Sequence, residues 1–358
     1  MARNRVIYQS EAVYIGAAEG GAAQNIKRVQ SCNYNFSIER QDLNQFGELA
    51  AIDRIILQEP TVNVDLTYFL DTDSASNENT FGFSQSPQHV LSGIIADTGD
   101  SSVNIIIGTS PPGVDHLMSG VMPASGWIAI GNAYLTSWSL EASVGAVPTV
   151  TCAFEGQNIA FTTAVVNNPS FDTGGSVIGG SIMPTSFTAF DSGLSVSAVK
   201  PGDVSISLKR TLSDANPDST PGLGINESDL KIQSATIALT MSREPLRRLG
   251  KRMAFSRELT FPITCTFSVN AVIGEAVAGS LAAMYTGVNG DSTTYDCVMN
   301  LTGYVGSTSS VRTFALKKAK LNSQNITSSI GPNKMVTLEL SAQIGKDSGL
   351  FMSPNNTY

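Results

Sequence analysis

Polar and apolar residues alternate with a period of two wherever the chain shows a regular pattern. In VNVDL (62–66) the valines and the leucine alternate with asparagine and aspartate. The same alternation recurs at 34–38, 150–154, 264–269 and 335–340. One apolar face and one polar face are typical of half-buried strands in an antiparallel sheet. The consecutive apolar run at Val103–Ile107 predicts a strand that is buried on both faces.

The pattern occurs twice along the chain. Residues 29–66 align without a gap over 232–269 at a constant offset of 203, and 133–154 align over 319–340 at an offset of 186. The identical pairs of the first block are Gln30/Gln233, Ser31/Ser234, Arg40/Arg243, Leu43/Leu246, Gly47/Gly250, Ala51/Ala254, Arg54/Arg257 and Thr61/Thr264. Internal repetition on this scale predicts one fold present in two copies.

One segment of each copy departs from the alternation. Leu43, Phe46, Leu49 and Ala50 recur at intervals of three and four residues, and their apolar counterparts in the second copy are Leu246, Leu249 and Met253. This spacing predicts a short helix, with Asp42 as its N-cap in the first copy. We therefore expect a mainly β chain of two tandem antiparallel β-sandwich or barrel domains, each with one short helix.

The region between the copies, 160–230, is rich in glycine, serine, threonine, asparagine and proline. We place a first β domain at 1–165, a linker or projecting segment at 166–200, and a second β domain at 201–358. The polar stretch 71–80 (DTDSASNENT) has no counterpart in the second copy and is predicted to be a hairpin tip or projecting loop.

Charged residues make up 15% of the 358 residues, well below the usual quarter, and the net charge is −8. An acidic chain of this kind is not expected to grip DNA through its phosphates. A surface poor in charge suits a protein that covers much of that surface with copies of itself, although a β-protein with a Ser/Thr-rich exterior would also explain it. No signal peptide or membrane span is expected, and Cys152 and Cys265 read as reduced core thiols.

Catalytic and metal-binding motifs are not found in the sequence. His89 and His116 follow no metal-ligand spacing, and the Asp71-x-Asp73 pair lacks the glycine and the terminal glutamate of a calcium loop. No nucleophile elbow, P-loop or strand-linked GxGxxG occurs. We expect no catalytic residues, no metal and no cofactor, and an enzyme is the least favoured class.

The one constellation that suggests a function is electrostatic. Where the repeat is acidic in the first copy it is basic in the second: the acidic set is Asp42, Glu48 and Asp53, and the basic set is Arg247, Arg248, Lys251 and Arg252. Opposite charges on equivalent elements predict that the copies meet at a subunit interface, where complementarity fixes their order. A solvent-exposed face whose charge has diverged between the copies explains the pattern about equally well. Nucleic-acid binding by the basic set is a less favoured interpretation, because no aromatic residues are interleaved with the basic ones.

The repeated module resembles bacteriophage major tail (tail tube) proteins. The resemblance rests on NYNFSIERQDLNQFGEL (33–49) and on the hairpin AYLTSWSLEASVGAVPTVTCAFEG (133–156). It implies a virion tail protein, assembled in the host cytoplasm, whose copies self-associate into stacked rings around a lumen. With two domains per chain, three copies would give a pseudo-hexameric ring. The implied partners are the tail terminator, tape measure and baseplate proteins, and genomic DNA would pass without specific binding.

Two alternatives remain open from the sequence. A capsid decoration or baseplate protein could use the same sandwich twice. A β-sandwich carbohydrate-binding module for host recognition would need exposed aromatic residues, yet Trp127 and Trp138 are predicted to lie in a hairpin core.

Overall fold

The computed structural model describes 11–17, 22–57, 59–70, 77–95, 102–109, 126–162, 186–187, 199, 201–211, 231–250, 254, 256–272, 294–302, 310–327 and 334–353. We call 11–187 the first half of the chain and 199–353 the second half. His116 lies outside the described residues.

Strands dominate both halves, which confirms the predicted mainly β class. The first half contains β1 (Glu11–Ala17), β2 (Ala22–Asn25), β3 (Val29–Ser37), β4 (Arg40–Leu43), β5 (Asp53–Ile56), β6 (Thr61–Phe69), α1 (Asn77–Thr80), the 3-10 turn η2 (Val90–Ser92), β7 (Val103–Thr109), β8 (Gly126–Ser143), β9 (Thr149–Gly156), β10 (Asn158–Thr162) and β11 (Ser186–Phe187). The second half contains η4 (Pro201–Asp203), β12 (Val204–Thr211), β13 (Lys231–Thr240), β14 (Arg243–Leu246), β15 (Ser256–Leu259), β16 (Thr264–Val272), β17 (Thr294–Thr302), β18 (Ser310–Thr327), β19 (Met335–Gln343) and β20 (Gly349–Ser353).

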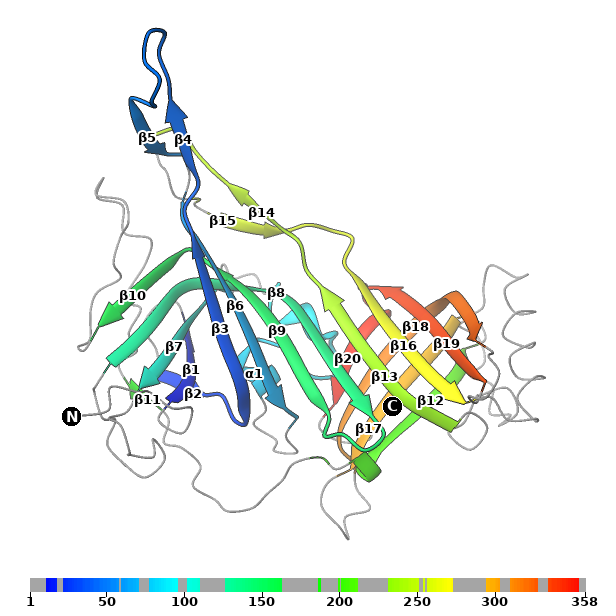
Figure 1. The fold of residues 1–358 in the computed structure, drawn as a ribbon. Coiled ribbons are helices and arrows are strands. Elements are labelled where there is room, and N and C mark those ends of the chain that lie inside the picture. Colours follow the sequence, from blue (N-terminus) through cyan, green and yellow to red (C-terminus); the bar gives the residue numbers. More distant parts are fainter. Residues whose placement is uncertain are drawn as a thin grey trace.

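Each half has an inner and an outer sheet that share one long strand (Figure 1). In the first half β8 pairs with β7 and β10 over its N-terminal part and with β9 over its C-terminal part. In the second half β18 pairs with β17 and β20 first and with β19 afterwards. The long strand therefore crosses from the outer sheet into the inner sheet.

The inner sheets of the two halves form one continuous sheet. β8 pairs with β13 antiparallel, from Ser143↔Ser234 to Ser137↔Thr240. The resulting strand order is β3-β6-β9-β8-β13-β16-β19-β18. Apolar side chains of this inner sheet pack against the outer sheets to form one core cluster that spans both halves, with Trp138, Phe154, Phe267 and Phe314 among its largest members.

The predicted short helices are wrong. The segment from Arg40 to Ile56 is a two-stranded hairpin, β4–β5, and the aligned segment of the second half is the hairpin β14–β15. Asp42 lies within β4 and therefore caps no helix. The side chains of Phe46 and Leu49 are fully exposed, so the apolar spacing has no surface against which a helix could bury them. A helix of this length is unstable in water without such packing, and Gly47 supplies the positive φ (95°) of the turn.

Other predictions from the pattern hold where the structure describes them. β7 covers the Val103–Ile107 run and is almost wholly buried, and Cys152, Cys265, Trp127 and Trp138 are buried. The predicted projecting loop at 71–80 is wrong for its last residues, because Asn77–Thr80 form α1 with Asn77 and Glu78 buried. Residues 71–76 lie outside the described part of the chain.

A buried ion pair joins the two halves behind the inner sheet. Arg312 Nη1 of β18 lies 3.0 Å from Glu78 Oε2 of α1, with both side chains at most 4% exposed. The hydroxyl of Tyr68 donates to the other carboxylate oxygen at 2.7 Å. Burial and the nearby Glu78 raise the pKa of Tyr68 well above its ordinary value, so this hydroxyl remains a donor. Glu78 thus fixes the outer sheet of one half against the inner sheet of the other.

Replacing one partner of this pair should destabilise the monomeric chain strongly. We expect Glu78→Gln to lower the free energy of unfolding by about 3–5 kcal/mol, because Arg312 keeps its buried charge and loses the opposing one. Denaturation in urea, followed by tryptophan fluorescence, measures this. Glu78→Gln with Arg312→Met should be less destabilised than Glu78→Gln alone, since the unpaired charge is then removed. A double variant whose loss is the sum of the two single losses would contradict the pairing.

Candidate assembly interface

The continuous inner sheet ends in two strand edges. Among the described residues β3 pairs with β6 alone, and the part of β18 from Lys320 to Thr327 pairs with β19 alone. An unpaired edge presents backbone N–H and C=O groups that bind another strand readily, so an exposed edge marks either an interface or an aggregation hazard. These two edges lie at opposite ends of the same sheet.

The β8–β13 junction shows how two such edges join in this chain. Two backbone hydrogen bonds bracket it: Val144 N–H donates to Gln233 O at 2.9 Å, and Met241 N–H donates to Thr136 O at 2.8 Å. Within the ladder Leu140 faces Ile237, and neither side chain is exposed to solvent. Backbone pairing and apolar burial therefore act together at this junction.

The strand registers of the two halves coincide at the offsets found in the sequence. β3 pairs with β6 as β13 pairs with β16 at an offset of 203, with Tyr34↔Val64 matching Ile237↔Phe267. β8 pairs with β9 as β18 pairs with β19 at an offset of 186, with Leu140↔Val150 matching Ile326↔Val336. The register shifts fall at matching places as well, after Leu135 and after Leu321. β3 is therefore the counterpart of β13, and the C-terminal part of β18 is the counterpart of that of β8.

The free edges expose apolar side chains that their counterparts bury. Tyr34 on β3 is 38% exposed and Ile326 on β18 is 52% exposed, whereas Ile237 and Leu140 are 0% exposed. Tyr34 also contacts the ring of Phe161, itself 65% exposed, at a centroid distance of 6.3 Å. Apolar residues gathered along an unpaired strand edge indicate a surface that another strand covers.

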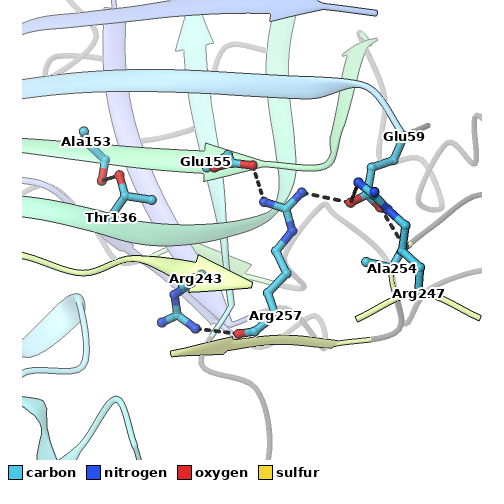
Figure 2. A network of polar contacts seen from close by, with 8 residues as sticks. All are labelled: Glu59, Thr136, Ala153, Glu155, Arg243, Arg247, Ala254 and Arg257. Atoms are coloured by element: carbon cyan, nitrogen blue, oxygen red, sulfur yellow. Dashed lines mark hydrogen bonds and ion pairs between the residues drawn. The ribbon is translucent and has the colours of Figure 1, made fainter. Parts of the chain in front are cut away.

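The hairpin β14–β15 fastens the second half to the first (Figure 2). Arg257 of β15 contacts the carboxylate of Glu155 on β9, and its Nη2 lies 3.0 Å from Glu59 Oε1. Glu59 Oε2 accepts the N–H of Ala254 at 2.7 Å, and the guanidinium of Arg243 lies 4.8 Å from the ring centroid of Tyr134 on β8. We call this group the Arg257 clamp; it joins Arg243, Ala254 and Arg257 to Glu59, Tyr134 and Glu155.

The clamp is buried and charged. Arg257 is 5% exposed and Glu59 is 1% exposed. Burial alone would lower the pKa of Arg257, but the neighbouring carboxylates of Glu155 and Glu59 outweigh it and raise the pKa above its ordinary value. The guanidinium therefore stays charged, and its fork of donors reaches two carboxylates on different elements.

Within the part of the chain that the structure describes, the counterpart hairpin β4–β5 makes no such contact. Arg54, the counterpart of Arg257, is 69% exposed and pairs with Asp42 of the same hairpin at 2.7 Å. Ala51, the counterpart of the buried Ala254, is exposed. The hairpin projects beyond the sheet, as Figure 1 shows at its top left.

The structure distributes the predicted interface residues over both hairpins. Asp42, Glu48 and Asp53 lie exposed on β4–β5 or its loop, and Arg247 and Arg248 lie exposed beyond β14. Arg247 Nη2 is 3.9 Å from Glu59 Oε1, at the margin of the clamp. Lys251 and Arg252 lie outside the described residues, so the predicted meeting of Glu48 with Lys251 stays a prediction.

The charge pattern missed the residues that hold the clamp together. Glu59 and Glu155 are not part of the acidic set, because they lie outside the hairpin itself. Arg257 was visible as an arginine identical in both copies and as one member of the basic stretch 242–257. What distinguishes Arg257 from Arg54 is the pair of carboxylates that face it. Because these carboxylates lie far from Arg257 in the sequence, the sequence does not reveal that they are close in space.

The open face of the inner sheet is polar and weakly acidic. The side chains that alternate with core residues there are mostly serine, threonine and asparagine. On the parts of the strands that lie in this sheet, the acidic residues are Asp65, Glu141, Glu155 and Glu339 and the basic ones are Lys231 and Lys320. The other basic residues of β18 belong to its outer-sheet part. A surface of this composition repels phosphate groups weakly and offers few cations to hold them.

The described residues offer no chemistry of another kind. They contain no group of three or more potential ligands that could hold a metal ion. None of the helices within them is long and apolar enough to cross a membrane.

Comparison with known proteins gives weak structural likenesses. No protein-family model and no curated protein sequence matches the chain. A component of the PVC sheath–tube complex of an extracellular contractile injection system aligns at 10% identity and a TM-score of 0.32, covering 45% of this chain and 94% of that one. A chain of the anti-feeding prophage baseplate aligns at 14% identity and a TM-score of 0.27, covering 41% and 91%. Hcp1 of E. coli EAEC 042 aligns at 14% identity and a TM-score of 0.20, covering 42% and 98%. At these scores the likeness carries no functional argument.

The Arg257 clamp should contribute far more to stability than the ion pair of the projecting hairpin. We expect Arg257→Ala to lower the free energy of unfolding of the monomer by about 3–5 kcal/mol, because the buried Glu59 loses its hydrogen-bonded counter-charge and keeps only the more distant Arg247. The matched control is Arg54→Ala at the counterpart position, which should cost at most about 1 kcal/mol since its ion pair is exposed. Equal small losses for the two variants in urea denaturation would show that the clamp does not hold the halves together.

Proposed function

We propose that this protein is the structural subunit of a tail-type tube, and that its copies join edge to edge into a ring. The observation that carries the proposal is the pair of free edges whose counterparts, β8 and β13, already join within the chain. β3 of one copy then pairs with β18 of the next in the register of the β8–β13 junction. A head-to-tail interface of this kind closes into a ring when the rotation between copies permits.

The counterpart register fixes which residues meet across the junction. Applying the two offsets to the β8–β13 pairs places Tyr34 of one copy opposite Ile326 of the next. These are the two exposed apolar residues of the free edges, and their counterparts Ile237 and Leu140 form a fully buried pair. Closure therefore buries apolar surface and satisfies two strand edges in one step.

We further propose that the two halves are a duplicated tube domain and that three copies complete the ring. Each chain contributes eight strands to the inner sheet, four from each half. The ring is then a trimer with roughly sixfold shape, and both free edges of every inner sheet are paired. A ring that stacks on further rings forms a tube, with tail terminator, tape measure and baseplate proteins as the expected partners at its ends and inside it.

The open face of the inner sheet suits the lining of a passage for DNA. It carries hydroxyl and amide side chains, with four acidic and two basic residues on the inner-sheet parts of its strands. Phosphates passing such a wall are repelled rather than paired, so they do not stick. We therefore propose a phage virion tail as the place of this protein, assembled in the host cytoplasm, with genomic DNA moving through the lumen.

A cysteine pair tests both the register and the size of the ring. The offsets place Asn35 opposite Asn325 as Ala238 lies opposite Ser139. This is a non-hydrogen-bonded pair, where Cα atoms lie about 4.5 Å apart, a spacing that a disulfide accepts. We expect Asn35→Cys with Asn325→Cys, in a Cys32→Ser background, to give covalent species up to the trimer and none larger on a non-reducing gel.

The control pair is Asn33→Cys with Ser323→Cys, which the proposed register separates by four residues along the strands. It should cross-link poorly. Cross-links from the control pair and none from the test pair would contradict the register. A ladder that continues past the trimer would contradict a ring of three, and the absence of any oligomer in electron micrographs or by solution mass would contradict ring formation.

Removing one outward backbone donor should block the ring without unfolding the chain. The bracketing bonds at Val144 and Met241 show that Trp138 and Leu140 bond to β13, so their counterparts Gln324 and Ile326 direct N–H groups toward the free edge. We expect Gln324→Pro to stay monomeric, because proline removes a donor only from the open side of an edge strand. Gln324→Thr keeps the N–H and should still assemble. Rings formed equally well by both variants in solution-mass measurements would show that this edge is not used.

A further inference from the structure

The junction within the chain and the proposed junction between copies differ in the rim residues that face the hairpin. Within the chain, the hairpin β14–β15 rests on the rim of the first half, and Arg257 is held there by Glu59 and Glu155. Between copies, the equivalent hairpin is β4–β5, and the equivalent rim is that of the second half. The offsets of 203 and 186 identify the rim residues that Arg54 would meet.

None of these rim residues can act as an acidic partner. Pro262 stands at the place of Glu59, and Ser341 stands at the place of Glu155. Lys320 stands at the place of Tyr134, whose ring lies beneath the guanidinium of Arg243. Arg40 and Arg54 would therefore face a hydroxyl, a proline and an ammonium group.

The β4–β5 hairpin itself also differs from β14–β15, because its arginine finds a partner within the hairpin. Arg54 pairs with Asp42 of its own hairpin and is 69% exposed. Leu43, Ile52 and Ile55 of this hairpin are between 37% and 53% exposed. An arginine that is satisfied within its own hairpin, opposite a rim that carries no carboxylate at the equivalent places, gains little from docking.

We propose that the junction between copies is the weak seam of the ring, because the β4–β5 hairpin meets a rim that lacks the carboxylates of the Arg257 clamp. This rests on the proposed ring. The seam is held by backbone pairing and by the Tyr34–Ile326 contact, and the junction within each chain carries the clamp in addition. The ring therefore opens between copies before the two halves of a chain separate, and a single carboxylate on the rim of the second half can strengthen the seam.

The test places that carboxylate at the position equivalent to Glu155. We expect Ser341→Glu to lower the dissociation constant of the copy–copy contact at least about threefold per junction at low salt, measured by mass photometry across a dilution series. Ser341→Asp is the second variant, and the urea denaturation of each monomer shows that the chain still folds. Thr337→Glu is the matched control, since it adds the same charge to the same strand and face, four residues away from the rim.

The partner of the new carboxylate is identified by a double-mutant cycle. Ser341→Glu with Arg54→Ala should return to the dissociation constant of the unmodified chain, because the gain depends on Arg54. Arg54→Ala alone should leave the unmodified ring unchanged. A ring that is weakened by Arg54→Ala alone, or that Ser341→Glu strengthens no more than Thr337→Glu does, would overturn the weak seam.

The Asn35–Asn325 cross-link separates the two levels of the proposal. Cross-linked trimers that show no response to Ser341→Glu overturn the seam and leave the ring intact. Chains that give neither cross-links nor rings overturn the proposed function itself.

Discussion

The architecture depends on the ladder of backbone hydrogen bonds between β8 and β13. Without it the chain would be two β-sandwiches joined only by a linker, each with an unpaired strand edge at both ends of its inner sheet. With it, eight strands follow one another in a single sheet and only two edges remain. Backbone hydrogen bonds do not depend on which side chains the strands carry. The same geometry can therefore be repeated wherever two strand edges meet in the register of the β8–β13 pair.

Side chains decide how firmly each such joint holds. Leu140 and Ile237 make the joint apolar on the core side, and the Arg257 clamp adds buried charge on the rim. Glu78 and Arg312 add a second buried pair behind the sheet. Each of these ion pairs links residues about 100 to 230 positions apart in sequence. The halves are therefore fixed to one another on the rim and behind the sheet, as well as through the ladder itself.

The strands and their correspondence between the two halves were predictable from the sequence, and the hairpins were not. Period-two alternation at 62–66 and 335–340 reports a local property, one buried face, and the gap-free offsets predicted which strands correspond. The spacing of Leu43, Phe46 and Leu49 misled because a helical period stabilises a helix only where another surface buries it, and Phe46 and Leu49 are fully exposed. The clamp depends on Glu59 and Glu155, which approach Arg257 only through the tertiary fold. Opposite charge on equivalent hairpins was a visible signal, but the clamp uses Glu59 and Glu155, which lie outside that acidic set.

The two long strands have a mechanical consequence. β8 and β18 each run for 18 residues through an outer and an inner sheet. Each passes from one sheet to the other at a residue of positive φ, Asn132 in β8 and Lys318 in β18. Backbone that is hydrogen-bonded to neighbouring strands resists stretching and shear, and each long strand is bonded in this way in both layers. A tilt of the inner wall must therefore appear as a displacement of the outer wall, and strain applied at the inner surface is carried to the exterior through the backbone itself.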